Sequence, residues 1–161
     1  MGAVVIRTAV ADDLDAVTDV FRQASWANVG DRPLLTDHPE FLELSDVGVR
    51  DGRTVLALTD GRVVGFATLA GSGQCVELED VFVHPDAMRH GVGRALLTEL
   101  TARARRADAV GIQVDANAHA LAFYERIGFV TIGEVTLEHG TAIRMRLDLG
   151  PDAPLPRPGA R

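Results

Sequence analysis

The chain has 161 residues, an apolar content of 47% and a formal charge of −7, values that fit one soluble globular domain and argue against a nucleic acid as its main partner. It has a single cysteine, Cys75, and no apolar run long enough to span a bilayer, so we expect neither an intrachain disulfide nor a membrane protein. We expect a cytoplasmic protein, because no signal peptide is recognisable, and no metal site, because no Cys/His cluster has zinc spacing.

Hydrophobic periodicity divides the chain into seven strands and four helices. Residues 30–33 are interpreted as a break and residues 46–52 as a loop. In chain order the expected elements are a strand (Ala3–Val10), a helix (Leu14–Ala27), a short helix (Pro39–Leu44), three strands (Thr54–Thr59, Arg62–Ala70, Val76–Val83), a long helix (Gly91–Ala107), a strand (Val110–Val114), a helix (Asn117–Ile127) and two strands (Phe129–Leu137, Thr141–Leu149). Residues 150–161 hold four of the seven prolines, and we expect a mobile tail there, outside a single domain of residues 1–149.

A strand, a glycine loop and the start of a helix follow one another between Val81 and Arg94. The run Val-Phe-Val ends just before Pro85, and a polar loop then leads to Gly91 and Gly93. The first amide groups of a helix have no intrahelical partner and carry partial positive charge, so this junction suits a phosphate. It is not a P-loop, because the chain has no lysine, and not a dinucleotide fingerprint, because position 96 is leucine.

Two motifs in the second half of the chain occur in a fixed order. The first is Met88-Arg89-His90-Gly91-Val92-Gly93, and the second runs from Asn117 to the heptapeptide Phe-Tyr-Glu-Arg-Ile-Gly-Phe that ends at Phe129. Together they resemble the GNAT superfamily of N-acetyltransferases, whose first motif is Gln/Arg-x-x-Gly-x-Gly/Ala at the start of a long helix. Met88 departs from that pattern, and Arg89 beside it offers a replacement donor. The resemblance extends from about Val4 to Leu149.

The resemblance implies an α/β (α+β) fold, with a mixed, mostly antiparallel sheet of about seven strands flanked by four helices. Its fourth and fifth strands would be a splayed parallel pair, with coenzyme A between them. A parallel pair also follows from the crossover rule, because a long helix joins these two strands. The activity implied is transfer of an acetyl group from acetyl-CoA to a primary amine, by direct attack in a ternary complex.

The family's cofactor contacts can be carried over residue by residue. The loop and helix start would hold the pyrophosphate, with added charge from Arg89 and Arg94, although solvated helix surface is the alternative for these two arginines. The strand before the loop would pair with the pantetheine and polarise the acetyl carbonyl. Asn117 would cap the last helix and contact the pantetheine, or serve only as a cap. The residues assigned to the cofactor are Val81, Phe82, Val83, Arg89, His90, Gly91, Val92, Gly93, Arg94 and Asn117.

Two residues are assigned to catalysis. By resemblance, Tyr124, the only tyrosine, donates a proton to the departing sulfur; a phenol has a pKa near 10 and stays protonated at neutral pH. Simple packing beside Phe123 is the alternative. The expected base is Glu79 on the cofactor strand. The residues that follow it as candidates are Glu77, Asp80, His84 and His119.

The acceptor is left open by the sequence. In the family it is held by the first two helices, their loop and the last hairpin, which here carry Trp26, Asn28, Asp31, Arg32, Phe41, Glu43, Glu138 and His139. Trp26 either walls this pocket or completes the core. An acidic chain suits a cationic amine, so a small amine or peptide is favoured; a homodimer is compatible with the family. Two other functions stay open: a regulatory module that binds acyl-CoA without catalysis, and a protein that binds another phosphate or nucleotide at the same loop.

Overall fold

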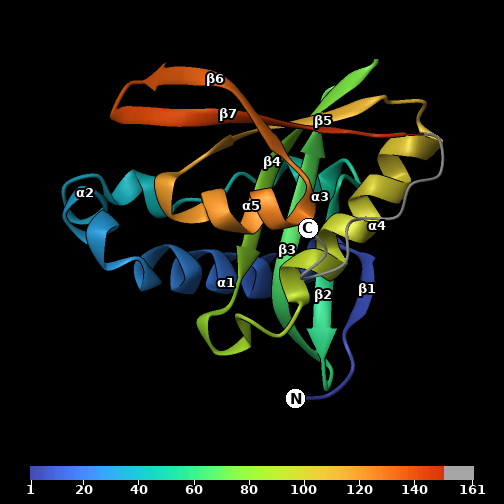
Figure 1. Cartoon of the computed structure of the whole chain (residues 1–161). Helices are drawn as coiled ribbons and strands as arrows, with labels where there is room; N and C mark the ends of the chain where they lie inside the picture. The colour runs from blue at the N-terminus through green and yellow to red at the C-terminus, as the bar shows by residue number, and fades with distance from the viewer. Residues whose placement is uncertain (151–161) are drawn as a thin grey trace. The chain divides into compact units, whose positions relative to one another are not determined.

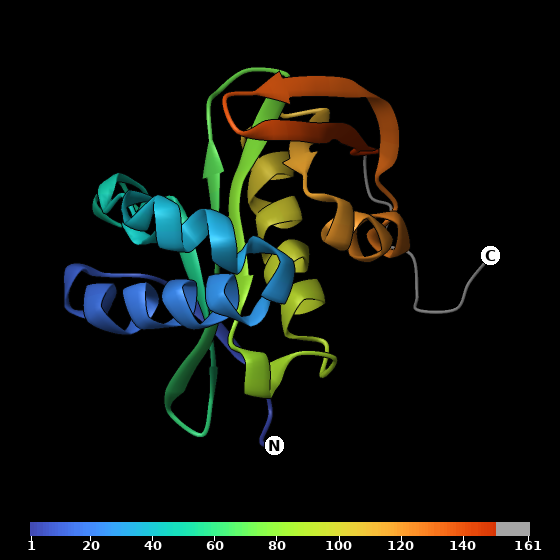
Figure 2. The same ribbon diagram turned by 90° about the vertical axis from the view of Figure 1, so that its left-hand side faces the viewer.

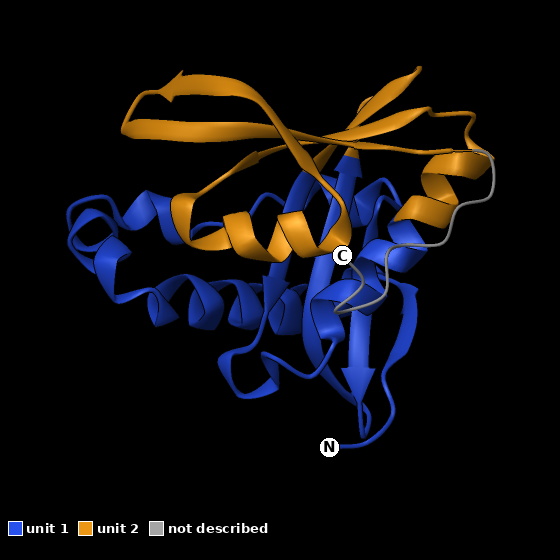
Figure 3. Cartoon of the chain, viewed as in Figure 1, with its two compact units in different colours: residues 1–69, 79–100 blue, residues 70–78, 101–161 orange. Residues whose placement is uncertain are grey.

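The computed structural model describes residues 1–150, so the expected mobile tail, apart from Gly150, lies outside the described residues. The described chain forms two compact units: unit 1 comprises Met1–Leu69 and Glu79–Leu100, and unit 2 comprises Ala70–Leu78 and residues 101–150 (Figure 3). The single domain expected over residues 1–149 stays a prediction. No helix within residues 1–150 is long and apolar enough to cross a membrane.

Seven strands and five α-helices make up the described chain (Figure 1). In chain order they are β1 (Val5–Thr8), α1 (Leu14–Ala27), α2 (Arg32–Asp37), α3 (Val47–Arg50), β2 (Thr54–Thr59), β3 (Arg62–Ala70), β4 (Cys75–Val83), α4 (Val92–Arg106), β5 (Gly111–Ala116), α5 (Leu121–Ile127), β6 (Val130–Leu137) and β7 (Gly140–Asp148). The strands form one sheet in the order β1-β2-β3-β4-β5-β7-β6, and β4 and β5 run parallel. The predicted fold class is therefore confirmed.

Two predictions about the region between α1 and β2 differ from the structure in part. The first helix ends at Ala27, as predicted, but the residues expected to break it include the start of α2 at Arg32, because Pro33 occupies its first turn, where a missing N–H does no harm. The predicted loop at residues 46–52 contains α3, a single helical turn. Gly48 in that turn packs so closely on Thr54 and Thr68 that a Cβ there would lie 2.9 and 2.7 Å from their side chains. This close contact determines where α3 lies, and no pattern within the segment itself predicts it.

Element boundaries explain the other differences. The first strand, expected over Ala3–Val10, is limited to β1. The short helix expected over Pro39–Leu44 is a 3-10 turn over Pro39–Leu42. The helix expected from Asn117 begins later, as α5, after a 3-10 turn over Ala118–Ala120. It ends as predicted at Ile127, and the next residue, Gly128, has a φ of 118° in the left-handed region that favours glycine.

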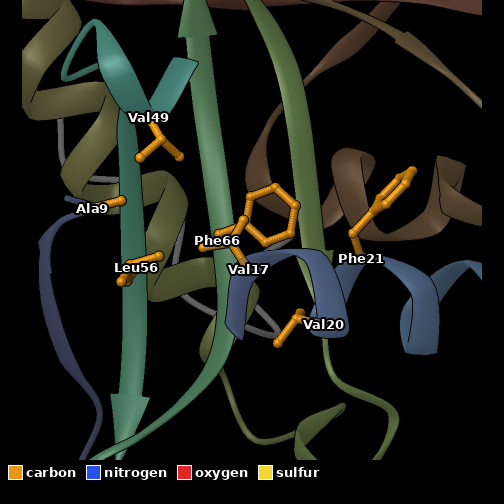
Figure 4. Close-up of a cluster of buried hydrophobic side chains, with 7 residues drawn as sticks. All are labelled: Ala9, Val17, Val20, Phe21, Val49, Leu56 and Phe66. Carbon is orange, nitrogen blue, oxygen red and sulfur yellow. The ribbon is translucent and has the colours of Figure 1, made fainter. Parts of the chain in front are cut away.

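In unit 1, α1 packs its apolar face on the sheet. Val17, Val20 and Phe21 of this helix meet Leu56 of β2 and Phe66 of β3 in a buried cluster (Figure 4). Leu56 and Phe66 are opposite each other in the antiparallel register of β2 and β3, so they point to the same face. Apolar side chains three and four apart on α1 thus complete this part of the core.

The first turns of α4 cover the opposite face of β3 within unit 1 (Figure 2). Successive strand residues point to opposite faces, so Gly65 faces away from the cluster around Phe66. A Cβ at Gly65 would lie 3.0 Å from Val92 Cγ1 and 3.3 Å from Leu96 Cδ1. Glycine at this position therefore allows α4 to approach the strand closely.

Unit 2 contains the antiparallel ladder of β5, β7 and β6. Ile112 and Val114 of β5 pair with Leu147 and Met145 of β7, and all four are buried. The residues that alternate with them, Gln113 and Arg146, are polar and partly exposed, and the next pair of the ladder, Asp115 and Arg144, forms a salt bridge. In both views α5 lies alongside this sheet (Figures 1 and 2).

Candidate functional site

The loop before α4 has an unusual backbone. Arg89 has a φ of 63° and Gly91 a φ of 79°, so both lie in the left-handed region, which costs a non-glycine residue about 1–2 kcal/mol. The His90 ring donates from Nδ1 to the Met88 carbonyl oxygen at 2.7 Å and closes the loop. Apart from its two chain neighbours, no atom of residues 1–150 lies within 4 Å of the position that a Cβ would take at Gly91, so the loop surface is open there. A strained arginine in an ordered loop is typical of a functional position.

The loop feeds directly into the start of α4. The first helical bond runs from the Ala95 N–H to the Gly91 carbonyl at 3.0 Å. The amides of Val92 and Gly93 precede this bond, at the end of the helix where amides lack a carbonyl one turn earlier, and the helix dipole adds positive charge there. The predicted pyrophosphate residues, from Arg89 to Arg94, thus share one loop and one helical turn that has the backbone form of an anion site.

The predicted pantetheine strand lies in β4, within the same unit. The Phe82 ring packs against Phe21 and Phe66, with ring centroids 4.9 and 5.5 Å away. The partly buried Phe82 side chain therefore packs against the core cluster of unit 1. The strand is continued by His84, whose N–H donates to the Val64 carbonyl at 2.8 Å.

The parallel pairing of β4 with β5 is short. Cys75, Val76 and Glu77 pair with residues 111–113, and within the described chain this register stops there, although β4 continues to Val83. A short parallel ladder is what a splayed pair requires; the splay itself stays a prediction. Glu77 belongs to this ladder, where its carboxylate accepts from Gln113 Nε2 at 2.9 Å.

Arg53, a residue that sequence motifs did not indicate, forms an ion pair with Glu79, the predicted base. Arg53, just before β2, donates from Nη1 to the Leu69 carbonyl at the end of β3 and to Glu79 Oε2 on β4, at 2.5 and 3.1 Å. The Arg53 side chain thus reaches across β3, which lies between β2 and β4 in the sheet. Glu79 is half-exposed and ion-paired. Because Arg53 and Glu79 are 26 residues apart, only the strand order could have revealed the pair.

The neighbouring carboxylate is in a different environment. Burial is the main cause that raises the pKa of Asp80 to about 6, and the charge of Glu79 raises it further. A hydrogen bond from Thr68 and the charge of Arg53 act in the opposite direction. The Thr68 hydroxyl oxygen in turn lies 2.8 Å from the hydroxyl oxygen of Thr54, its partner in the antiparallel register. Asp80 therefore keeps its proton to a higher pH than an ordinary aspartate does.

The remaining predicted residues lie in unit 2. Tyr124 on α5 is buried, and its ring packs edge-on against Phe123 and Phe129, with centroids 5.1 and 5.3 Å away. Asn117 stands at the start of the 3-10 turn with extended backbone, and its side chain makes no capping hydrogen bond. The prediction that this side chain caps the last helix is therefore wrong. His119 is exposed in the same turn.

Two further features belong to unit 1. Trp26 is 43% exposed, so it does not complete the core; the Arg32 guanidinium lies 5.6 Å above its ring. A cavity of about 220 Å³ is lined by the β2–β3 turn, His84 and Asp86, and none of the residues assigned to the cofactor lines it. Within residues 1–150, no group of three or more histidine, cysteine or acidic side chains is placed to hold a metal ion.

Comparison with known proteins identifies the family. The model of the acetyltransferase (GNAT) family matches residues 19–129, which include the loop, β4, α4 and α5. The chain belongs to the GNAT family. Glucosamine 6-phosphate N-acetyltransferase of Schizosaccharomyces pombe is 30% identical over 83 residues, which are 47% of this chain and 75% of that protein. The chain spans 40–75% of the length of the curated relatives that it matches.

Solved GNAT structures share the fold. The PaiA N-acetyltransferase of Thermoplasma acidophilum, in complex with coenzyme A, matches with a TM-score of 0.76 at 17% identity, over 91% of this chain and 99% of that one. The ribosomal-protein-S18-alanine N-acetyltransferase of Escherichia coli matches with a TM-score of 0.68 at 22% identity, over 91% and 94% of the two chains. At these identities the likeness shows the GNAT fold, and residue roles in this chain are proposals.

Proposed function

We propose that this protein is an N-acetyltransferase that uses acetyl-CoA as co-substrate. The observation that carries the proposal is the turn of Arg89 and Gly91, both left-handed, that opens α4 in a chain of the GNAT family. The amides from Arg89 to Arg94 bind the pyrophosphate, and the guanidinium groups at both ends of this segment add charge. The main chain of Val81–Val83 pairs with the pantetheine, and Asn117 adds a side-chain contact to it.

In the proposed reaction a neutral amine attacks the thioester carbonyl and the C–S bond breaks. A main-chain N–H of Val81–Val83 stabilises the oxyanion of the tetrahedral intermediate. Tyr124 donates its phenolic proton to the departing thiolate and regains a proton from the nitrogen, which becomes the amide. The packing of its ring between two phenylalanines supports this role, because it fixes the direction of the hydroxyl group.

The acceptor is a primary amine without an anionic group. Ten acidic residues and four arginines lie within residues 1–51, which gives this segment a formal charge of −6 out of the chain's −7. The segment contains α1 and α2, the elements that hold the acceptor in the family. A negative field attracts a cation and repels a phosphate. We therefore expect a peptide N-terminus or a small cationic amine to react faster than glucosamine 6-phosphate.

A thermal-shift experiment tests the cofactor. Acetyl-CoA at a hundred times its dissociation constant should add about 2.7 kcal/mol and raise the melting temperature by about 5–10 °C, whereas ATP and NAD should have no such effect. Gly91→Ala and Gly61→Ala form a matched pair, because both glycines have a left-handed φ (79° and 76°) and open space around them. Both variants should lose similar stability, but only Gly91→Ala should lose affinity for acetyl-CoA. Equal affinities would contradict the proposed loop.

Turnover distinguishes an enzyme from a regulatory module that only binds acyl-CoA. Thiol release from acetyl-CoA is measured with spermidine, an alanine-initiated peptide and glucosamine 6-phosphate. Tyr124→Phe should lower kcat by about 10²–10⁴-fold and leave the Kd of acetyl-CoA unchanged. Binding without thiol release for any amine would support the regulatory module instead.

A further inference from the structure

The ring of His90 is held in one tautomer by the loop before α4. Its Nδ1 atom lies 2.7 Å from the main-chain carbonyl oxygen of Met88. A carbonyl oxygen can only accept a hydrogen bond, so Nδ1 carries the hydrogen atom. In the neutral ring the other nitrogen, Nε2, therefore has a lone pair and no hydrogen atom. A second proton can bind to this ring only at Nε2.

The segment that carries this ring otherwise offers donors to an anion. The amides of Val92 and Gly93 precede the first helical bond of α4, and Arg89 supplies a guanidinium from a strained, left-handed residue. A neutral His90 adds an acceptor to this set of donors. Protonation of Nε2 replaces the lone pair by an N–H donor and adds a positive charge, and both changes favour a phosphate group.

No other group of the described chain engages Nε2. Within residues 1–150 the bond to Met88 is the one hydrogen bond of the ring, and neither His90 nor Arg89 has an ion pair or another electrostatic contact. The ring is exposed, and so is Asp86, the nearest acidic residue in the sequence. Because Nδ1 carries its hydrogen atom in both forms of the ring, protonation leaves the bond to Met88 in place. The loop therefore changes its charge without losing this hydrogen bond.

We propose that the binding of acetyl-CoA is coupled to protonation of His90 at Nε2, so that this loop binds its co-substrate more tightly at acidic pH. The inference rests on the proposed acetyltransferase function. A proton from solvent adds to Nε2, no bond of the co-substrate breaks, and the new N–H donates to a phosphate oxygen. By linkage, the complex holds this proton more tightly than the free protein does, so binding takes up protons in the pH range where histidine titrates.

Isothermal titration calorimetry with acetyl-CoA, at a series of pH values from about 5.5 to about 8, tests the proposal. His90→Asn is the decisive variant, because its amide can still donate to the Met88 carbonyl but does not titrate in this range. Relative to His90→Asn, the Kd of the wild type should fall about tenfold from the upper to the lower end of the series. This comparison cancels the titration of the phosphate groups of acetyl-CoA itself.

Two further variants are controls. His90→Arg carries a permanent charge, so its Kd should depend on pH no more than that of His90→Asn does. His38→Asn is the matched control for a His-to-Asn change, because His38 pairs with Glu40 outside this loop, and it should keep the pH dependence of the wild type.

Proton uptake is measured by repeating the titrations near neutral pH in buffers that differ in their enthalpy of ionisation. The wild type should take up a fraction of a proton more for each acetyl-CoA bound than His90→Asn does. Equal uptake by the two proteins would contradict the coupling.

Nitrogen-15 NMR of the histidine side chains gives a readout that needs no co-substrate. In the neutral ring of His90 the hydrogen atom should lie on Nδ1, and Nε2 should gain a proton on acidification. The proposal is overturned if Nε2 carries the hydrogen atom in the neutral ring, or if the Kd of the wild type and of His90→Asn depends on pH in the same way. If acetyl-CoA binds at no pH, the acetyltransferase function fails instead, and inorganic pyrophosphate, titrated into both proteins, then decides whether a bound anion protonates His90.

Discussion

Gly65→Ala tests how closely α4 packs on β3 in unit 1. The added methyl group would lie 3.0 Å from Val92 Cγ1, 3.1 Å from the Phe82 carbonyl oxygen and 3.3 Å from Leu96 Cδ1, all shorter than an ordinary contact. Val92 and Leu96 are buried, so neither side chain can turn into solvent. Overpacking of this kind costs about 1–3 kcal/mol, and the lower entropy of the unfolded alanine chain returns about 0.4–1 kcal/mol. We expect a net loss of about 1–2 kcal/mol.

Urea unfolding followed by far-UV circular dichroism measures this loss as a lower midpoint with an unchanged slope. Gly133→Ala is the matched control, because Gly133 also lies in a strand, has no atom within 4 Å of the new methyl group and needs no left-handed backbone. That variant should be as stable as the wild type or slightly more stable. If Gly65→Ala is as stable as Gly133→Ala, the close approach of α4 to β3 is refuted.

Three further predictions concern stability. Asp80→Asn should raise the free energy of unfolding at pH 7, because the raised pKa of Asp80 makes its ionisation unfavourable in the folded state. This gain in stability should shrink as pH falls from about 6 to below about 4. A variant that is less stable than the wild type at pH 7 would contradict the prediction. Arg7 lowers the pKa of Asp13, so Asp13→Asn should lose the most stability above about pH 4. The difference from the wild type should vanish as pH falls further. Denaturant midpoints measured at each pH check this. Phe66→Ala should cost about 3–5 kcal/mol in urea titrations, whereas the exposed Val130→Ala should change little; similar losses would contradict the packing of the α1 cluster.

Local signals predicted much of the fold. The two strands expected over Thr54–Thr59 and Arg62–Ala70 are joined by Asp60-Gly61, a pair typical of a hairpin turn, and the glycines after Pro85 predicted the start of α4; both features depend on backbone conformations that few residues adopt. Gly128 likewise marked the end of α5. These features are encoded within a few residues of where they occur.

The predicted and observed elements differ where contacts with residues distant in the sequence determine the local structure. Pro33 was interpreted as a helix breaker, although proline in a first turn is harmless. The turn α3 exists because Gly48 fits against two buried threonines on other strands. In the candidate site, the sequence predicted Glu79 as the base and Asp80 as a further candidate, but their contacts with Arg53 and Thr68 depend on the strand order.

The boundary between the two units cuts β4 after Leu78, and this has a consequence for synthesis on the ribosome. Residues 79–83 can pair with β3 as soon as they emerge, because β3 precedes them in the chain. The first residues of β4, which include Val76, must wait for Gly111–Gln113, their parallel partners. At about 5–20 residues per second, the 34 residues from Glu77 to Gly111 take about 2–7 s. During that interval the backbone of Cys75–Glu77 has no partner on that edge, so we expect this open strand edge to be a contact point for chaperones on the nascent chain.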